Sequence, residues 1–244
     1  MIRIVRPSLN QELADRLPPL TAEIAAAARR AETARLVWKR TSVRQNVHAS
    51  LRQVLAGMAP GIECCMYCGD SQGADIDHFE PLARNPLRTF DWLNHLLACS
   101  TCNSHNKGSR FPLDLDGSPL LIDPTTEDPF DHLLLTPTLG EYRGLTPKGS
   151  ATIEVCALNR PTLTRGRQQA HRVVLMCLKQ WSEAFEHDPG AMREAVITVR
   201  EQPFADVCQS LLRLALSPGA AKVIDDLHVL DLLRRAELRQ ALLS

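Results

Sequence analysis

From Pro161 onward, apolar residues recur at three-to-four spacing, as in helices that bury one face. The dipeptides Pro189-Gly190 and Pro218-Gly219 divide this region, and Pro203 interrupts its middle part. The pattern therefore predicts three helical units between residues 161 and 244.

The N-terminal region also has the pattern of helices. Residues 21–40 are rich in alanine and have high helix propensity, and a second helix is expected over residues 42–57. Pro18-Pro19 is expected to break the chain before the first of these helices.

Residues 61–112 contain cysteines, turn residues and too few large apolar side chains to build a core, so we expect a metal to hold this segment. Downstream we expect a strand at 119–123 and a hairpin with Gly149 in its turn and residues 152–158 as a strand. The predicted fold is α+β and mainly helical, with a helical region at 1–60, a central module at 61–160 and a helical region at 161–244.

The composition indicates a globular protein, with 44% hydrophobic and 23% charged residues. No apolar run approaches the roughly 20 residues that span a bilayer, and the first residues lack the apolar core of a signal peptide. We therefore expect a cytoplasmic protein with no membrane partner, in which the eight cysteines are thiols or metal ligands.

The net charge is zero, but its distribution is uneven. Residues 1–52 hold ten Arg and Lys against four Asp and Glu, and residues 111–244 hold fourteen against eighteen. The N-terminal cations would either follow a phosphate backbone or form a solvated helix face. The residues expected on this surface are Arg29, Arg30, Arg35, Lys39, Arg40 and Arg44.

Two Cys-x-x-Cys pairs predict a zinc site. Cys65 and Cys68 form the first pair, and Cys99 and Cys102 form the second. Two intervening residues let both sulfurs of a pair reach one ion, and four thiolates complete a tetrahedral shell that suits zinc. Such a zinc would be structural, because no position is left for water. Cys64 could compete for the site, but Cys65 has the better spacing.

Between the pairs, Asp77-His78 occupies a short predicted strand that ends at Pro81. His78 could be the general base for phosphodiester hydrolysis, and Asp77 offers an oxygen to Mg²⁺ or Mn²⁺. Adjacent strand residues point to opposite faces, so both serve one phosphate only near a strand end.

Other site residues are expected nearby. Asn103 and Lys107 would share one face of a helix, with Asn103 as the second metal ligand and Lys107, with Arg110, contacting phosphate. Asn94 would fix the loop that carries His78. His105 or Asn106 would replace Asn103 as ligand if the helix began later.

These residues carry a resemblance. The run CMYCGDSQGADIDHFEP, followed by WLNHLLACSTCNSHNKG, resembles HNH endonucleases of the zinc-knuckle, ββα-metal type, which are treble-clef-like. The three motif positions fall on His78, Asn94 and Asn103. The pattern extends to the LNR of residues 158–160 and is similar to stand-alone bacterial HNH proteins of Septu-type and retron-linked anti-phage systems.

The resemblance implies a metal-dependent endonuclease that cuts DNA and leaves 5′-phosphate and 3′-hydroxyl ends. It further implies a regulatory ATPase partner, for which the C-terminal helices would provide the docking surface; alternatively these helices only cover the nuclease. The competing interpretation is a non-catalytic zinc-held module that binds nucleic acid or protein. A zinc hydrolase is disfavoured, because four thiolates leave no open position.

Overall fold

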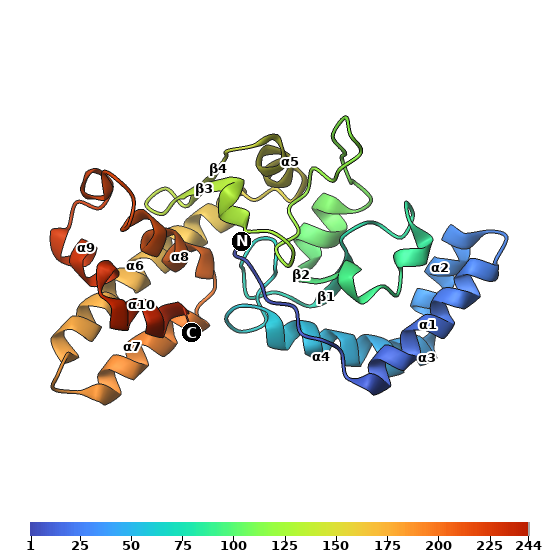
Figure 1. The fold of residues 1–244 in the computed structure, drawn as a ribbon, viewed down its shortest axis with the longest axis horizontal. Helices are drawn as coiled ribbons and strands as arrows, with labels where there is room; N and C mark the ends of the chain where they lie inside the picture. Colours follow the sequence, from blue (N-terminus) through green and yellow to red (C-terminus); the bar gives the residue numbers. More distant parts are fainter. Residues whose placement is uncertain (244) are drawn as a thin grey trace.

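The computed structural model describes residues 1–243. It is mainly helical, as predicted, and its parts lie in an arc, with the N-terminal helices at one end, two short hairpins in the middle and the C-terminal helices at the other end (Figure 1). Within the described residues, no helix is both long enough and apolar enough to cross a membrane.

Residues 1–10 have no regular secondary structure, and most of the remaining N-terminal region is helical. Its elements are α1 (Gln11–Ala26), α2 (Arg30–Lys39), α3 (Thr41–Val43), the π-helical η1 (Arg44–His48) and α4 (Ala49–Met58). The second expected helix, over 42–57, is confirmed as the continuous run α3–η1–α4.

The first expected helix has different bounds. The prediction of a break at Pro18-Pro19 was wrong, because α1 runs through both prolines. Asn10 caps the helix by accepting a bond of 2.8 Å from the Leu13 amide, and Leu13 and Leu17 are buried on its inner stripe. Packing of that stripe outweighs the roughly 3 kcal/mol that an interior proline costs.

The central module has a ββα order. Strand β1 (Asp75–His78) pairs antiparallel with β2 (His95–Ala98), and the π-helical η4 (Thr101–Lys107) follows. Asp77 lies opposite Leu96 and His78 opposite His95. The loop between the strands contains η2 (Pro86–Arg88) and η3 (Trp92–Asn94).

The second hairpin differs from the prediction. It is formed by β3 (Leu133–Thr136) and β4 (Glu141–Gly144), preceded by η5 (Pro129–Asp131), and residues 147–155 form a helix, α5 (Pro147–Val155). The expected strand at 119–123 is only a single bridge between Leu113 and Pro119. Gly149 lies inside α5, where a Cβ would sit 1.9 Å from the His132 carbonyl oxygen. Glycine is therefore required for close helix packing and not for a turn.

The C-terminal region is helical, as predicted. Its elements are α6 (Pro161–Ala184), α7 (Pro189–Glu201), α8 (Ala205–Leu214), η6 (Ala220–Lys222), α9 (Leu227–Arg234) and α10 (Ala236–Leu243). The expected interruption at Pro203 is the junction between α7 and α8.

The buried apolar residues form two cores. The larger core contains the zinc-knuckle cysteines together with residues of β1–β2, β3–β4 and all five C-terminal helices. The smaller core joins α1, α2 and η1 to Phe90 of the interstrand loop. The C-terminal helices therefore share one core with the central module.

Candidate functional site

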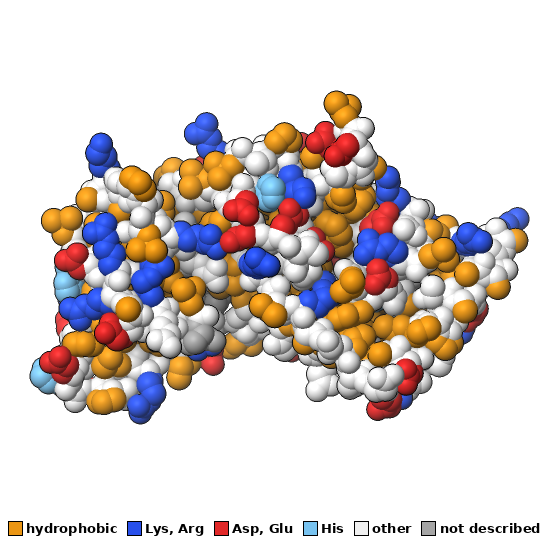
Figure 2. All heavy atoms as spheres, in the orientation of Figure 1, with side chains coloured by type: hydrophobic (Ala, Val, Ile, Leu, Met, Phe, Trp, Pro, Cys, Tyr) orange, Lys and Arg blue, Asp and Glu red, His pale blue; other side chains and the backbone are white. Residues whose placement is uncertain are grey.

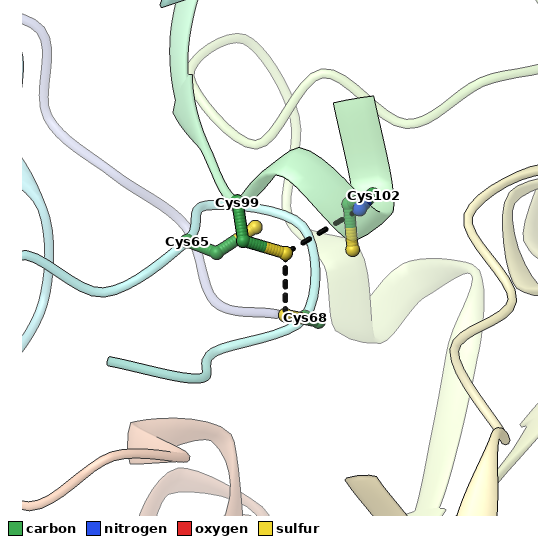
Figure 3. A group of neighbouring side chains, drawn as sticks. All are labelled: Cys65, Cys68, Cys99 and Cys102. Carbon is green, nitrogen blue, oxygen red and sulfur yellow. Dashed lines mark hydrogen bonds between the residues drawn. The ribbon is translucent and has the colours of Figure 1, made fainter. Parts of the chain in front are cut away.

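Four cysteines converge at the base of the ββα unit (Figure 3). Their sulfur atoms lie within 4.8 Å of one another, and all four side chains are buried. The members are Cys65, Cys68, Cys99 and Cys102. Cys64 lies outside the cluster, and burial raises the pKa of its thiol to about 12. The choice of Cys65 over Cys64 is therefore confirmed.

The cluster has the donor set and spacing of a structural zinc site. Tetrahedral zinc 2.3 Å from each sulfur separates the sulfurs by about 3.8 Å, and Cys68 Sγ lies 3.8 Å from Cys99 Sγ. The Arg160 guanidinium contacts the cluster, with Nη1 3.5 Å from Cys102 Sγ and Nη2 3.7 Å from Cys68 Sγ. A bound ion with four thiolates would carry net negative charge, which this guanidinium would offset.

One face of β1 is directed toward η4. Asp75 and Asp77 share this face, since strand side chains alternate. Asn103 Nδ2 lies 3.5 Å from Asp75 Oδ2, and Lys107 Nζ lies 3.1 Å from each oxygen of Asp77. The two helix residues expected to share a face thus do so, but each has a different carboxylate as its partner.

Lys107 and Asp77 form a fully buried ion pair. The Lys107 side chain is 0% exposed and that of Asp77 is 3% exposed. Lys107 Nζ also donates to the His78 carbonyl oxygen at 2.7 Å, and the Tyr67 hydroxyl donates to Asp77 at 2.6 Å. Burial raises the pKa of Asp77, while Lys107 and Tyr67 favour its ionised form. Lys107, expected to contact phosphate, instead points into the protein.

The opposite face of β1 carries His78. Its Nε2 lies 3.0 Å from the Thr89 carbonyl oxygen, and the Nε2 of the cross-strand His95 lies 2.9 Å from the same oxygen. A carbonyl oxygen only accepts, so the neutral ring of His78 must carry its proton on Nε2 and leave a lone pair on Nδ1. Burial lowers the pKa of His78 to about 4, so the ring is neutral near pH 7.

Asn94 holds the interstrand loop in place. Its Oδ1 accepts from the Glu80 amide at 2.8 Å, and its Nδ2 donates to the carbonyl oxygens of Glu80 at 3.0 Å and Arg88 at 3.1 Å. The Asn94 side chain is fully buried. These bonds position the segment that presents Thr89 to His78.

An aromatic residue of the N-terminal region covers the His78 ring. Trp38 of α2 contacts it edge-on, with ring centroids 4.4 Å apart, and its ring also packs at a tilt on His48 of η1 at 3.8 Å and on His95 at 5.5 Å. Burial lowers the pKa of His48 to about 4 and that of His95 well below its usual value. Three neutral histidines therefore surround Trp38.

The alternatives to Asn103 are directed away from β1. His105 Nδ1 lies 3.1 Å from the Ser100 carbonyl oxygen, and Asn106 Nδ2 donates to the Thr101 carbonyl oxygen at 2.7 Å. Arg110 is exposed, but its guanidinium donates to the carbonyl oxygens of Asn106 and Val155. Of the three candidate ligands, only Asn103 contacts a carboxylate of β1.

A divalent ion does not fit at Asp77 in this arrangement. The oxygens available to it, the Asp77 carboxylate and the His78 carbonyl, already surround the Lys107 ammonium. A second cation there would meet an ammonium at contact distance, and like charges repel. The expected pair of ligands, Asp77 and Asn103, is therefore not assembled.

The six cations of the predicted phosphate-binding surface are all exposed. Arg40 forms an ion pair with Glu23 of α1, and Arg29 forms one with Glu32 at 3.4 Å. Within residues 1–243, the cations of this set without an ion pair are Arg30, Arg35, Lys39 and Arg44. Figure 2 shows Lys and Arg side chains over the middle and both ends of the visible face, interspersed with Asp and Glu.

The segment that contains the four cysteines and the residues of β1, β2 and η4 matches a known protein family. Residues 65–109 match the family model described as HNH endonuclease. This segment is an HNH domain. The match begins at Cys65 and includes β1, β2 and η4, and HNH domains indicate a nuclease-type function. No curated protein matches the chain.

Several groups around the HNH domain were not predicted. Tyr67 lies between the first pair of cysteines, and His95 follows Asn94 directly, so both stood beside motif residues. Thr89 contributes only its carbonyl oxygen, and Trp38 comes from a distant helix. Nothing in the sequence signals either contact, because backbone groups and long-range packing have no local motif.

Proposed function

We propose that this protein is an endonuclease that hydrolyses DNA phosphodiester bonds, with His78 as the general base. The observation that carries the proposal is the fixed tautomer of His78 in an HNH domain: Nε2–H is directed to Thr89 O at 3.0 Å, and Nδ1 keeps its lone pair. A neutral imidazole with a free nitrogen can take a proton from water.

The low pKa of His78 has a physical role in this proposal. Burial and the nearby Lys107 and His48 disfavour the imidazolium. A phosphodiester brings negative charge toward the ring, which raises the pKa toward the range that suits proton transfer. The base would then be weak in the free protein and stronger with substrate bound.

DNA would approach along α2. Arg35 and Lys39 lie one turn apart on this exposed helix edge, and Trp38 beside them contacts His78. Cations at this spacing can follow successive phosphates without reading sequence. The same helix, α2, would thus bind the DNA phosphates and lie next to the general base, His78.

The test is nicking of supercoiled plasmid by the wild type and by His78→Ala. The control is His228→Ala, which removes an exposed histidine of α9 whose Nε2 lies 3.2 Å from Ser182 Oγ, far along the chain from the HNH domain. We expect His78→Ala to lose cleavage with unchanged zinc content and folding, and His228→Ala to keep both. Cleavage at the wild-type rate by folded His78→Ala would refute the role.

One observation favours the alternative, a non-catalytic nucleic-acid-binding module. His78 is only 8% exposed, and Asp77 and Lys107 are satisfied by each other within the protein. Tight DNA binding by the wild type without nicking under any condition would support this alternative.

A defence role with a regulatory ATPase partner is a further part of the proposal. The docking of such a partner is supported by an apolar groove of about 930 Å³ between β3, α6, α8 and α9, in which Met176 is 71% exposed. Met176→Asp tests docking without disturbing the shared core, whereas deletion of residues 161–244 would remove half of that core. Co-purification of an ATPase with the wild type, lost in Met176→Asp, is the expected result.

A further inference from the structure

Lys107 occupies the position in the HNH domain where a divalent ion was expected. A lysine ammonium has three N–H donors. Here the acceptors around Nζ are Asp77 Oδ1 and Oδ2, both at 3.1 Å, and the His78 carbonyl oxygen at 2.7 Å. The ammonium is therefore fully satisfied, and the three oxygens that would face an ion are already used.

The backbone of η4 directs Lys107 inward. η4 is π-helical, and its last bond runs from the Gly108 amide to the Asn103 carbonyl oxygen, five residues back, at 2.6 Å. Gly108 then adopts a positive φ of 51°, which ends the helix directly after Lys107. π-helical turns are rare and often occur at functional sites.

The groups around Lys107 Nζ suit an ammonium group and do not suit a divalent metal ion. Mg²⁺ takes about six oxygens in octahedral geometry and keeps several waters. Asp77 is 3% exposed, and its carboxylate also accepts from Tyr67, so no room for a hydrated ion is left beside it. Asn103, the second expected ligand, is directed to Asp75.

We propose that the Lys107 ammonium is the resident cation of this site, and that Asp77 holds it in place of a divalent metal ion. Lys107 then places its ammonium group against the carbonyl oxygen of His78. This inference rests on the proposed nuclease function for its meaning, but its test does not require cleavage.

The first measurement is Mn²⁺ titration of ¹⁵N-labelled, zinc-loaded full-length protein, with amide NMR as the readout. Mn²⁺ broadens the signals of nuclei near its binding site. We expect the amide signals of Asp77 and His78 to keep their intensity with Mn²⁺ at one to two equivalents. Broadening centred on Asp77 would overturn the proposal, and this measurement needs no variant.

The second measurement compares Mn²⁺ affinity in three forms of the protein by EPR of free Mn²⁺. We expect Asp77→Asn to bind Mn²⁺ as the wild type does, as should the control Asp231→Asn, which changes an exposed residue of α9. A tenfold or greater loss of affinity confined to Asp77→Asn would overturn the proposal. Absence of plasmid nicking would instead contradict the nuclease function and leave these binding results valid.

Discussion

Replacing Lys107 by methionine should strongly destabilise the protein. Methionine fills a similar volume but leaves the Asp77 carboxylate without its counter-ion, at a position where the two side chains are 0% and 3% exposed. Removing one member of a buried pair typically costs about 3–5 kcal/mol, because a buried charge is left uncompensated. Against a typical total stability of about 5–15 kcal/mol, this is a large fraction.

The assay is urea unfolding followed by tryptophan fluorescence. The free energy of unfolding falls with urea concentration by about 3 kcal/mol per M, so a loss of about 4 kcal/mol lowers the urea concentration at the unfolding midpoint by about 1.3 M. The control is Lys179→Met, which breaks an ion pair with Glu183 whose side chains are 77% and 69% exposed, and which should leave the midpoint unchanged.

The double variant Asp77→Asn with Lys107→Met distinguishes the ion pair from the loss of packing. It removes both charges, so it should recover more than half of the stability lost in Lys107→Met. A cost below about 1 kcal/mol for Lys107→Met would refute the account, and so would a double variant no more stable than the single one.

Three further predictions concern pH, zinc and DNA. The pKa of His78 falls from about 6.5 in the unfolded chain to about 4 in the folded protein. The free energy of unfolding should therefore fall by about 3 kcal/mol as the pH is lowered from 6.5 toward 4, because only the unfolded chain gains the proton in that window. His78→Gln should flatten that part of a plot of the urea midpoint against pH. Arg160→Gln should release zinc faster to a chromogenic chelator than Arg160→Lys does, because lysine keeps the positive charge near the sulfurs, and equal rates would contradict the charge argument. Alanine in place of three exposed cations, Arg35, Lys39 and Arg44, should weaken DNA binding. It should also reduce the slope of log K against log salt concentration by about 3. An unchanged slope would show that these cations form a solvated helix face and do not contact DNA.

The zinc cluster could be predicted because each Cys-x-x-Cys pair is local, and zinc needs four ligands, which two such pairs supply. Two residues between cysteines bring two sulfurs to one ion whatever the rest of the chain does. The HNH segment could likewise be predicted from the spacing of its motif residues, and the match to the HNH family model at residues 65–109 confirms it. The helix at 147–155 has a local signal too, because Thr146 caps it and Pro147 occupies its first turn, but the alternation of residues 152–158 is also typical of a strand.

The partners of the site residues could not be predicted. Asp77 and Lys107 are thirty positions apart, and only the folded strand and π-helical turn bring their charges into contact. Continuation of α1 through Pro18 likewise depends on tertiary packing that overrides local propensity. Motif spacing places Asp77 and Lys107 in one HNH segment, whereas their burial and their mutual contact depend on the whole fold.

The zinc knuckle meets parts of the chain that are synthesised much later. Its Gly69 carbonyl oxygen accepts from the Phe204 amide at 2.7 Å, and Arg160 lies over its sulfurs. On a ribosome that adds about 5–20 residues per second, roughly 5–20 s separate Cys102 from Phe204. During that interval the four thiols have no C-terminal cover and are open to oxidants and to competing metals. Early capture of zinc would therefore protect the nascent chain, and the later helices would enclose an ion already bound.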